Sequence, residues 1–188
     1  MGHVRDAFIA RGHAAISCDL EPTTAPGPHI VGDVRNYLRE GWDMMIGFPP
    51  CTYMTNTGVR WFYETTSSRK VVTGPLRWTK LSEAVELFLA LWNAPIDKVC
   101  LENPVMHPHA SELIGVKWSQ TIQPNQFGHH ETKQTCLWLR NLPNLKPTDT
   151  VPVYHRHRSH NEPPSADRWK KRSETFPGVA NAMANQWG

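Results

Sequence analysis

Hydrophobic and polar positions along the chain fall into two kinds of pattern. Between Thr79 and Ala94 apolar residues recur at helical spacing, which predicts an amphipathic helix. Continuous apolar runs over 43–48 and 98–101 are typical of strands buried on both faces. Shorter strands are expected over 14–18, 29–33, 121–127 and 135–140, and shorter helices over 4–11, 34–40 and 178–186. Strands that alternate with helices predict an α/β fold, a doubly wound and mostly parallel sheet with helices on both faces.

Length and composition indicate one ordinary domain. The chain has 188 residues, which predicts a single compact domain over 1–188. No apolar stretch is long enough to span a membrane, and the first residues lack the apolar core of a secretory signal. The four cysteines, at 18, 51, 100 and 136, are too far apart for a zinc pair or a compact disulfide frame. A reducing, cytoplasmic setting is therefore expected.

Positive charge is concentrated in one segment. The net charge of the chain is +3, but residues 154–173 hold six Arg and Lys against two acidic residues. Such a basic, Pro- and His-rich loop is either a solvated surface segment or a contact to nucleic-acid phosphates. The candidate contacts in it are Arg156, Arg158, Lys170 and Lys171. No carboxylate or cysteine completes a metal site with its histidines, so no metal is expected.

Polar residues follow four of the predicted strands. These residues are Asp19, Asp33, Pro49-Pro50-Cys51 and Glu102-Asn103-Pro104. Each one alone is explained by a helix cap, a turn or a small buried thiol. Together they would lie beyond the carboxyl ends of the strands, where open α/β sheets bind ligands. Two prolines stiffen the turn that presents Cys51, as a nucleophile requires. The histidines at 107, 109, 129 and 130 lie in polar loops and are expected to face solvent.

Three sequence blocks carry a family resemblance. The order GDV (32–34), GFPPCTYM (47–54) and LENPV (101–105) resembles the DNA cytosine-5 methyltransferases, in particular their small phage and prophage forms. The resemblance extends over 123–143 and 172–188. It implies a Rossmann-like methyltransferase fold that transfers a methyl group from S-adenosylmethionine to carbon 5 of cytosine in DNA. The target base would be flipped out of the duplex.

The resemblance also implies roles for single residues. Cys51, after Pro50, would add to carbon 6 of cytosine, and Glu102 would hold ring nitrogen N3, with Asn103 supporting that strand end. For the cofactor, Asp19 or Glu21 would bind the ribose hydroxyls, Asp33 and Val34 the adenine, and Phe48 and Pro49 the methionine end. Gln134 and Arg140 would contact the flipped cytosine.

The chain also departs from the family pattern. The family starts with a strand and a glycine-rich turn, whereas this chain starts at the helix that follows them. The missing strand would be central, between the strands that end at Asp19 and Phe48. The two strands would then meet, or a second chain would fill the gap, or the start is a truncation. Too few residues lie between Arg140 and Lys171 for a separate target-recognition domain.

Two other functions fit the same residues. The chain would be an inactive methyltransferase-like protein that binds nucleic acid or another protein. Alternatively, it would use the Cys51 and Glu102 pair on a free pyrimidine nucleotide.

Overall fold

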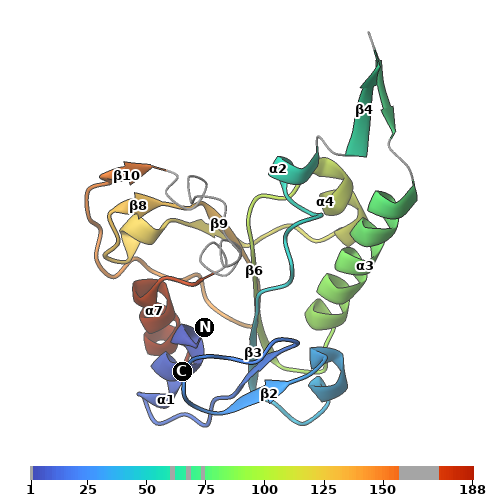
Figure 1. The fold of residues 1–188 in the computed structure, drawn as a ribbon. Coiled ribbons are helices and arrows are strands. Elements are labelled where there is room, and N and C mark those ends of the chain that lie inside the picture. Colours follow the sequence, from blue (N-terminus) through green and yellow to red (C-terminus); the bar gives the residue numbers. More distant parts are fainter. Residues whose placement is uncertain (1, 60–61, 67–68, 73–74, 157–173) are drawn as a thin grey trace. The chain divides into compact units, whose positions relative to one another are not determined.

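The computed structural model describes residues 2–59, 62–66, 69–72, 75–156 and 174–188 (Figure 1). Its contacts divide the chain into two units. We call residues 38–121 and 135–142 the sheet unit, and residues 1–37, 122–134 and 143–188 the terminal unit. Each is described by itself, and the single domain over 1–188 stays a prediction. None of the helices in the described ranges has the length and apolar character that a membrane span requires.

A four-stranded sheet forms the centre of the sheet unit. Its order is β3 (Met44–Gly47), β6 (Lys98–Asn103), β9 (Thr135–Arg140) and β7 (Gln120–Ile122). β3 pairs with β6 in parallel, whereas β9 runs antiparallel to β6. The chain is therefore α/β as predicted, but the sheet is mixed, and the doubly wound, mostly parallel arrangement is not confirmed. The apolar pattern does not reveal the direction of a strand. A strand that is buried on both faces has the same continuous apolar run whether it is parallel or antiparallel to its neighbour.

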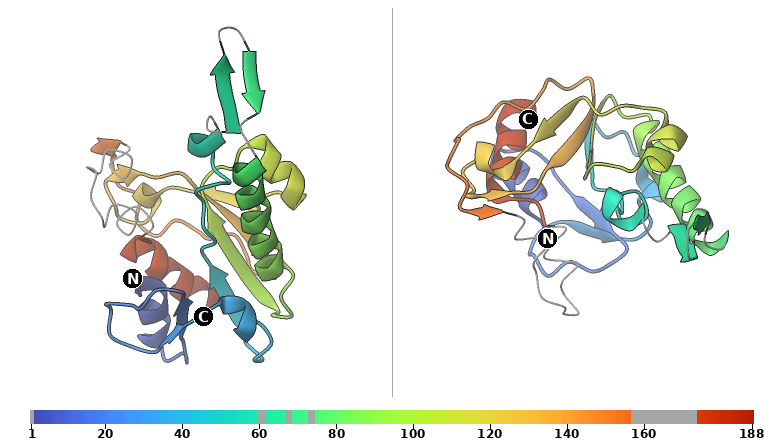
Figure 2. Two further views of the ribbon diagram at one scale, coloured as in Figure 1. Left: turned by 45° about the vertical axis from the view of Figure 1, so that its right-hand side comes forward. Right: turned by 90° about the horizontal axis from the view of Figure 1, so that it is seen from above.

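Helix α3 (Pro75–Trp92) covers this sheet, as Figure 2 shows. The predicted helix over 79–94 is confirmed, with both ends shifted toward the N-terminus. Its buried side chains recur at helical spacing and include Leu81, Val85, Phe88 and Leu91. The Phe88 ring meets Trp138 of β9 edge to face, with ring centroids 5.2 Å apart. Aromatic and aliphatic side chains of α3 and β9 thus form the core of this unit.

The described part of the sheet unit also contains two short helices and a hairpin. Helix α2 (Asn56–Val59) follows the segment that contains Cys51, and α4 (Pro108–Ile114) follows β6. Strands β4 (Tyr63–Thr66) and β5 (Arg69–Val72) form an antiparallel hairpin. Figure 2 shows this hairpin extending beyond the first turn of α3.

The described part of the terminal unit contains two α-helices and two short strand pairs. α1 (His3–Ile9) packs against α7 (Pro177–Trp187). Strand β1 (Ser17–Asp19) pairs in parallel with β2 (His29–Val31), and β8 (Glu131–Thr132) pairs with β10 (His155–Arg156). Short 3-10 helices cover Val34–Tyr37 and Pro124–Gln126. The strand predicted over 121–127 therefore ends at Ile122, because Pro124 cannot donate to a ladder and starts a helical turn instead.

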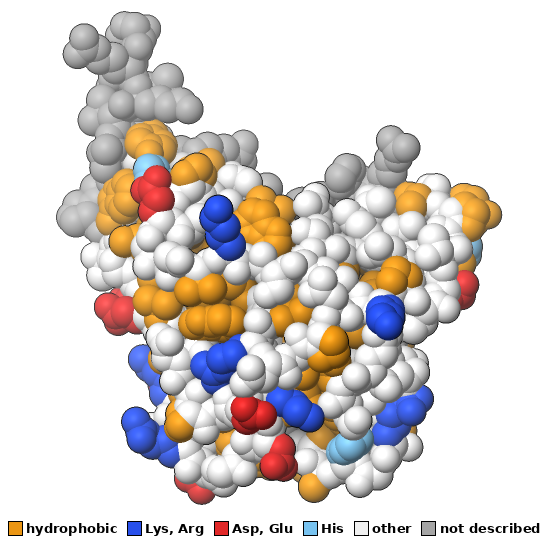
Figure 3. Space-filling view, turned by 180° about the vertical axis from the view of Figure 1, so that it is seen from behind, with side chains coloured by type: hydrophobic (Ala, Val, Ile, Leu, Met, Phe, Trp, Pro, Cys, Tyr) orange, Lys and Arg blue, Asp and Glu red, His pale blue; other side chains and the backbone are white. Residues whose placement is uncertain are grey.

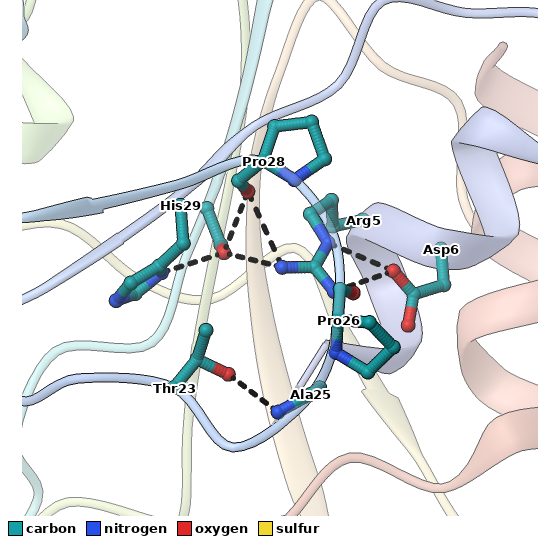
Figure 4. Close-up of polar contacts among 8 residues, drawn as sticks. Arg5, Asp6, Thr23, Ala25, Pro26, Pro28 and His29 are labelled. Atoms are coloured by element: carbon teal, nitrogen blue, oxygen red, sulfur yellow. Dashed lines mark hydrogen bonds and ion pairs between the residues drawn. The ribbon is translucent and has the colours of Figure 1, made fainter.

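Arg5 fastens α1 to the loop between β1 and β2 (Figure 4). Its side chain is buried, and its guanidinium donates to the carbonyl oxygens of Pro26 and Pro28 and to Ser17 Oγ. It also pairs with Asp6 at 2.7 Å. A planar group with five donors suits this cluster of acceptors, so a single side chain orders the loop.

The family's first strand, which would lie between β1 and β3 and is expected to be missing from this chain, has no counterpart among the described residues. β3 lies at the edge of the four-stranded sheet, and β1 and β2 form a separate pair. A second chain that fills this place is not supported.

Candidate functional site

The carboxyl ends of β3 and β6 lie at one edge of the sheet. In their parallel register Gly47 pairs with Leu101, so the residues that follow each strand leave the sheet side by side. Asn103 is fully buried, and its Nδ2 donates to the carbonyl oxygen of Pro49 at 2.9 Å. This bond fixes the start of the Pro49-Pro50-Cys51 turn against the end of β6. Sequence segments about fifty residues apart are thereby joined.

Cys51 lies at the start of a tight turn. Its carbonyl oxygen accepts from the backbone nitrogens of Met54 at 3.0 Å and Thr55 at 3.1 Å. Cys51 is not part of a disulfide, and the residue is half-buried. The structure thus places Cys51 and Glu102 at the same end of the β3–β6 pair, as the sequence predicts for ligand-binding residues.

Residues 105–107 run alongside the Cys51 turn. Thr55 and Met106 form an antiparallel bridge, and the backbone nitrogen of Asn56 donates to Val105 at 3.4 Å. The backbone nitrogen of His107 donates to Met54 at 2.9 Å. The segment after Glu102 therefore braces the segment after Cys51.

Glu102 is half-buried near the end of β6. Its Oε1 accepts a hydrogen bond of 3.0 Å from Oγ1 of Thr135, the first residue of β9. Thr135 is itself buried. The antiparallel pairing of β6 with β9 places this hydroxyl where it orients the carboxyl group.

The pKa values of the other three thiols are raised above the ordinary value. Burial raises the pKa of Cys100, and the charge of Glu102 adds to this effect. Burial also raises the pKa of Cys136. The pKa of Cys18 is raised by burial first and then by Asp19 and Asp33. A raised pKa makes a thiol a poor nucleophile at neutral pH, so these three are not candidates.

The predicted cytosine contacts lie apart from each other along β9. Gln134 is exposed and directly precedes Thr135, whereas Arg140 pairs with Val99 at the opposite end of β6. The Arg140 guanidinium donates to the backbone carbonyls of Ala94 at 2.7 Å and Ile96 at 2.5 Å, and to that of Trp92. The structure therefore does not bring Arg140 to the Glu102 end of the sheet. Its contacts fasten the chain that leaves α3.

The predicted phosphate contacts are mostly outside the described residues. Arg158, Lys170 and Lys171 lie in 157–173, and only the backbone of Arg156 is described, in β10. Over the described surface that Figure 3 shows, Lys and Arg side chains are scattered singly among acidic ones. Within the described ranges no three His, Cys, Asp or Glu side chains gather as a metal site.

Four of the predicted cofactor residues lie in the terminal unit. Asp19 and Glu21 are exposed, and Oδ1 of Asp19 accepts from the backbone nitrogen of Glu21 at 3.0 Å. Asp33 accepts from the backbone and side chain of Arg35, and these hydrogen bonds lower its pKa to about 2. Val34 begins a 3-10 helix directly after it. Exposed carboxylates of this kind are suitable acceptors for ribose hydroxyls.

The other two predicted cofactor residues lie in the sheet unit. Phe48 has 41% of its surface exposed, whereas Pro49 is buried. At the end of β6, Oδ1 of Asn103 is buried and has no hydrogen-bond partner among the described residues. The exposed Phe48 ring, directly after β3, is suited to contact an apolar part of a ligand.

An aromatic cluster that the sequence does not predict contacts the Cys51 turn at Tyr53. The Arg77 guanidinium lies over the Tyr53 ring at 5.2 Å and over the Phe62 ring at 5.0 Å. Phe62 also meets Trp78 and His107 edge to face. An open pocket of about 600 Å³ lies between α3 and α4, and Trp78 belongs to both the aromatic cluster and the pocket wall. The pocket is lined by Trp78, Thr79, Ser82, His109, Glu112 and Leu113.

Comparison with known proteins finds similarity to solved structures. No family model matches the chain, and no curated protein matches it. Among solved structures, it is similar to an E. coli prophage protein proposed to be a DNA modification methyltransferase. The identity is 11% and the TM-score 0.46, over 80% of this chain and 49% of that one. The chain thus spans about half the length of that neighbour.

Proposed function

We propose that this protein transfers a methyl group from S-adenosylmethionine to carbon 5 of cytosine in DNA, through a covalent adduct with Cys51. The observation that supports this most is the Asn103–Pro49 hydrogen bond, which joins the Pro-Pro-Cys turn to the strand end that presents Glu102. The family resemblance of the sequence requires these two segments to meet.

Cys51 acts as the nucleophile in this proposal. Carbon 5 of cytosine is a weak nucleophile, and addition of a thiolate to carbon 6 makes it electron-rich. Cys51 is half-buried on a rigid turn, whereas burial and nearby acids raise the pKa of the other three thiols and make them weaker nucleophiles. S-adenosylmethionine, when bound, supplies the methyl group. Loss of the carbon 5 proton and expulsion of the Cys51 sulfur then restore the ring.

Glu102 holds the cytosine ring during the addition. A carboxyl group that hydrogen-bonds to N3 withdraws electrons from the ring and makes carbon 6 a better acceptor for the thiolate. Thr135 Oγ1 occupies one carboxyl oxygen of Glu102 and thereby sets its orientation. The base must leave the duplex stack to reach both side chains.

The residues that the resemblance assigns to the cofactor keep their roles in this proposal. Asp19 and Glu21 accept the ribose hydroxyls, Asp33 and Val34 contact the adenine, and Phe48 lies at the methionine end. Asp33 forms an ion pair with Arg35. In this proposal Asp33 contacts the cofactor either while it stays paired with Arg35 or after the ion pair has opened.

DNA is bound through charge and one polar side chain in this proposal. The basic segment 154–173 contacts phosphates, which explains its six Arg and Lys residues. Gln134, exposed next to Thr135, contacts the flipped base.

Titration calorimetry and methyl transfer together test this function. The full chain is titrated with S-adenosylmethionine, and tritiated methyl groups are counted in cytosine-containing duplex DNA. We expect cofactor binding by both wild type and Cys51→Ser, and methyl transfer by wild type alone. Cys18→Ser serves as the matched control and retains transfer. DNA binding without any cofactor binding would overturn the proposal in favour of an inactive, nucleic-acid-binding protein. Methylation of free cytidine nucleotides but not of DNA would overturn it in favour of a nucleotide-modifying enzyme.

A further inference from the structure

His107 is fully buried between the Cys51 turn and helix α4. Its Nε2 lies 2.8 Å from the carbonyl oxygen of Tyr53, and its Nδ1 accepts from the backbone nitrogen of Ala110 at 3.2 Å. Its own backbone nitrogen donates to the carbonyl of Met54. The residue therefore contacts the turn twice and caps α4 once.

One neutral tautomer satisfies both ring contacts. The Tyr53 carbonyl only accepts, so Nε2 carries the proton, whereas the Ala110 N–H only donates, so Nδ1 is unprotonated. Burial lowers the pKa of His107, and the neighbouring His109 and Arg77 lower it further, against the Tyr53 hydrogen bond. The ring is therefore neutral at physiological pH and acts as a fixed donor to the turn.

Contacts from one segment hold Cys51 from both sides. Asn103 binds the Pro49 carbonyl two residues before Cys51, and His107 binds the carbonyls of Tyr53 and Met54 after it. All three contacts come from residues 103–107, directly after Glu102. Any movement of the turn relative to Glu102 must break at least one of them.

We propose that His107 is a positioning residue for Cys51. The hydrogen bond from His107 Nε2–H to the Tyr53 carbonyl fixes the thiol relative to Glu102. The position of the thiol is a property of the sheet unit alone. Its meaning for cytosine chemistry rests on the proposed function.

Two substitutions separate the two hydrogen bonds of the ring. In His107→Asn the side-chain oxygen reaches the Ala110 nitrogen and keeps the helix cap, but nothing reaches the Tyr53 carbonyl. In His107→Gln the longer amide reaches the Tyr53 carbonyl and donates to it, while the cap is weakened. His129→Asn is the matched control, because His129 also accepts from a helix nitrogen, that of Gly178, in the terminal unit.

The primary readout is the rate at which iodoacetamide alkylates Cys51, followed by peptide mass spectrometry between pH 6 and 9, with thermal midpoints measured alongside. We expect His107→Asn to change the Cys51 alkylation rate by about three- to tenfold, the range that one lost hydrogen bond gives. His107→Gln restores it to within about twofold, and His129→Asn leaves it unchanged. An unchanged rate in His107→Asn would overturn the proposal. Equal changes in His107→Asn and His107→Gln that follow the thermal midpoints would also overturn it, because they would show a structural role only.

A second readout links the position of the thiol to chemistry. Covalent trapping on 5-fluorocytosine DNA is expected to fall in His107→Asn and to recover in His107→Gln. If wild type forms no adduct, the proposed function fails, while the alkylation rates still decide the role of His107.

Discussion

At the scale of single residues, three buried side chains define the candidate site. Asn103, His107 and Thr135 each donate one hydrogen bond, to Pro49, Tyr53 and Glu102 respectively. None of them is a nucleophile or an acid in the proposed reaction. Their common effect is to fix the positions of Cys51 and Glu102, which is what pre-organisation of an active site requires.

Asn103→Asp tests the bond between β6 and the Cys51 turn. The change replaces the buried Nδ2 donor by an oxygen that faces the Pro49 carbonyl, so two acceptors oppose each other. We expect the free energy of unfolding in urea to fall by about 2–5 kcal/mol. Asn144→Asp, at an exposed position, is the control and changes it by less than about 0.5 kcal/mol. Equal stability of the two variants would contradict the role given to Asn103.

Two histidines predict a fall in stability at mildly acidic pH. Burial lowers the pKa of His107 and of His129 below the ordinary value of 6.5, and each neutral ring accepts a backbone N–H at the start of a helix. Between the folded and unfolded pKa values the unfolded chain binds more protons, so stability decreases as the pH falls through this range. Their contribution is complete above pH 6.5 and is lost below the folded-state pKa values.

Urea denaturation between pH 7.5 and 5 measures this effect. The double variant His107→Asn and His129→Asn should show a smaller decrease in unfolding free energy than wild type over the same range. Parallel pH profiles of the two proteins would contradict the prediction.

At the scale of elements, α3 and β9 determine the core of the sheet unit. Phe88 is fully buried and packs on Trp138, while Leu76 near the start of the same helix is largely exposed. The β9 strand separates the two predicted base contacts, because Gln134 precedes one of its ends and Arg140 occupies the other. Element direction therefore decides which predicted residues can share a site.

Phe88→Ala tests the packing of α3 on β9. Loss of a buried aromatic ring leaves a cavity and is expected to lower the free energy of unfolding by about 3–5 kcal/mol. Leu76→Ala on the exposed face changes it by less than about 0.5 kcal/mol. Chemical denaturation compares the two, and similar values for both would show that α3 does not cover the sheet in the way described.

Arg140→Lys tests the contact between the end of β9 and the chain that leaves α3. A lysine ammonium is a point charge and cannot span the carbonyls of Trp92, Ala94 and Ile96 as a guanidinium does. We expect a loss of about 1–3 kcal/mol in unfolding free energy, and no change in affinity for DNA. A variant of normal stability with weaker DNA binding would instead support Arg140 as a base contact.

The sequence predicts some of these elements and residues better than others. Apolar periodicity locates α3, and the apolar runs locate β3 and β6, because burial on one or both faces leaves a direct pattern. The Pro-Pro-Cys and Glu-Asn segments fall at strand ends, where the resemblance puts them. The antiparallel direction of β9 leaves no such pattern. His107 was expected in a solvent-facing loop and is buried, because its partners, the Tyr53 carbonyl and the Ala110 nitrogen, are backbone atoms that no side-chain pattern reveals.

At the scale of the whole molecule, charge is the property through which the chain would bind DNA in the proposed function. Outside residues 154–173 the chain carries slightly more acidic than basic residues. An interface that depends on one basic segment makes binding strongly dependent on salt.

Neutralising that segment tests its contribution. Replacing Arg156, Arg158, Lys170 and Lys171 by Gln removes up to four phosphate contacts. The slope of log Kd against log salt concentration should decrease by up to about 3 to 4, as four lost contacts imply. Fluorescence anisotropy with duplex DNA between 50 and 300 mM salt measures the slope, at roughly the concentrations where counterion release is resolved. An unchanged slope would show that the segment is a solvated loop.

The identity of the nucleophile is the central claim, and a covalent trap tests it most directly. The full chain is incubated with S-adenosylmethionine and duplex DNA that contains 5-fluorocytosine, from which the carbon 5 substituent cannot leave as a proton does. The adduct is digested and the cross-linked peptide is sequenced by mass spectrometry. We predict a DNA adduct on Cys51 that is absent in Cys51→Ala and present in Cys18→Ala. An adduct on another cysteine, or none from a chain that binds both cofactor and DNA, would contradict it.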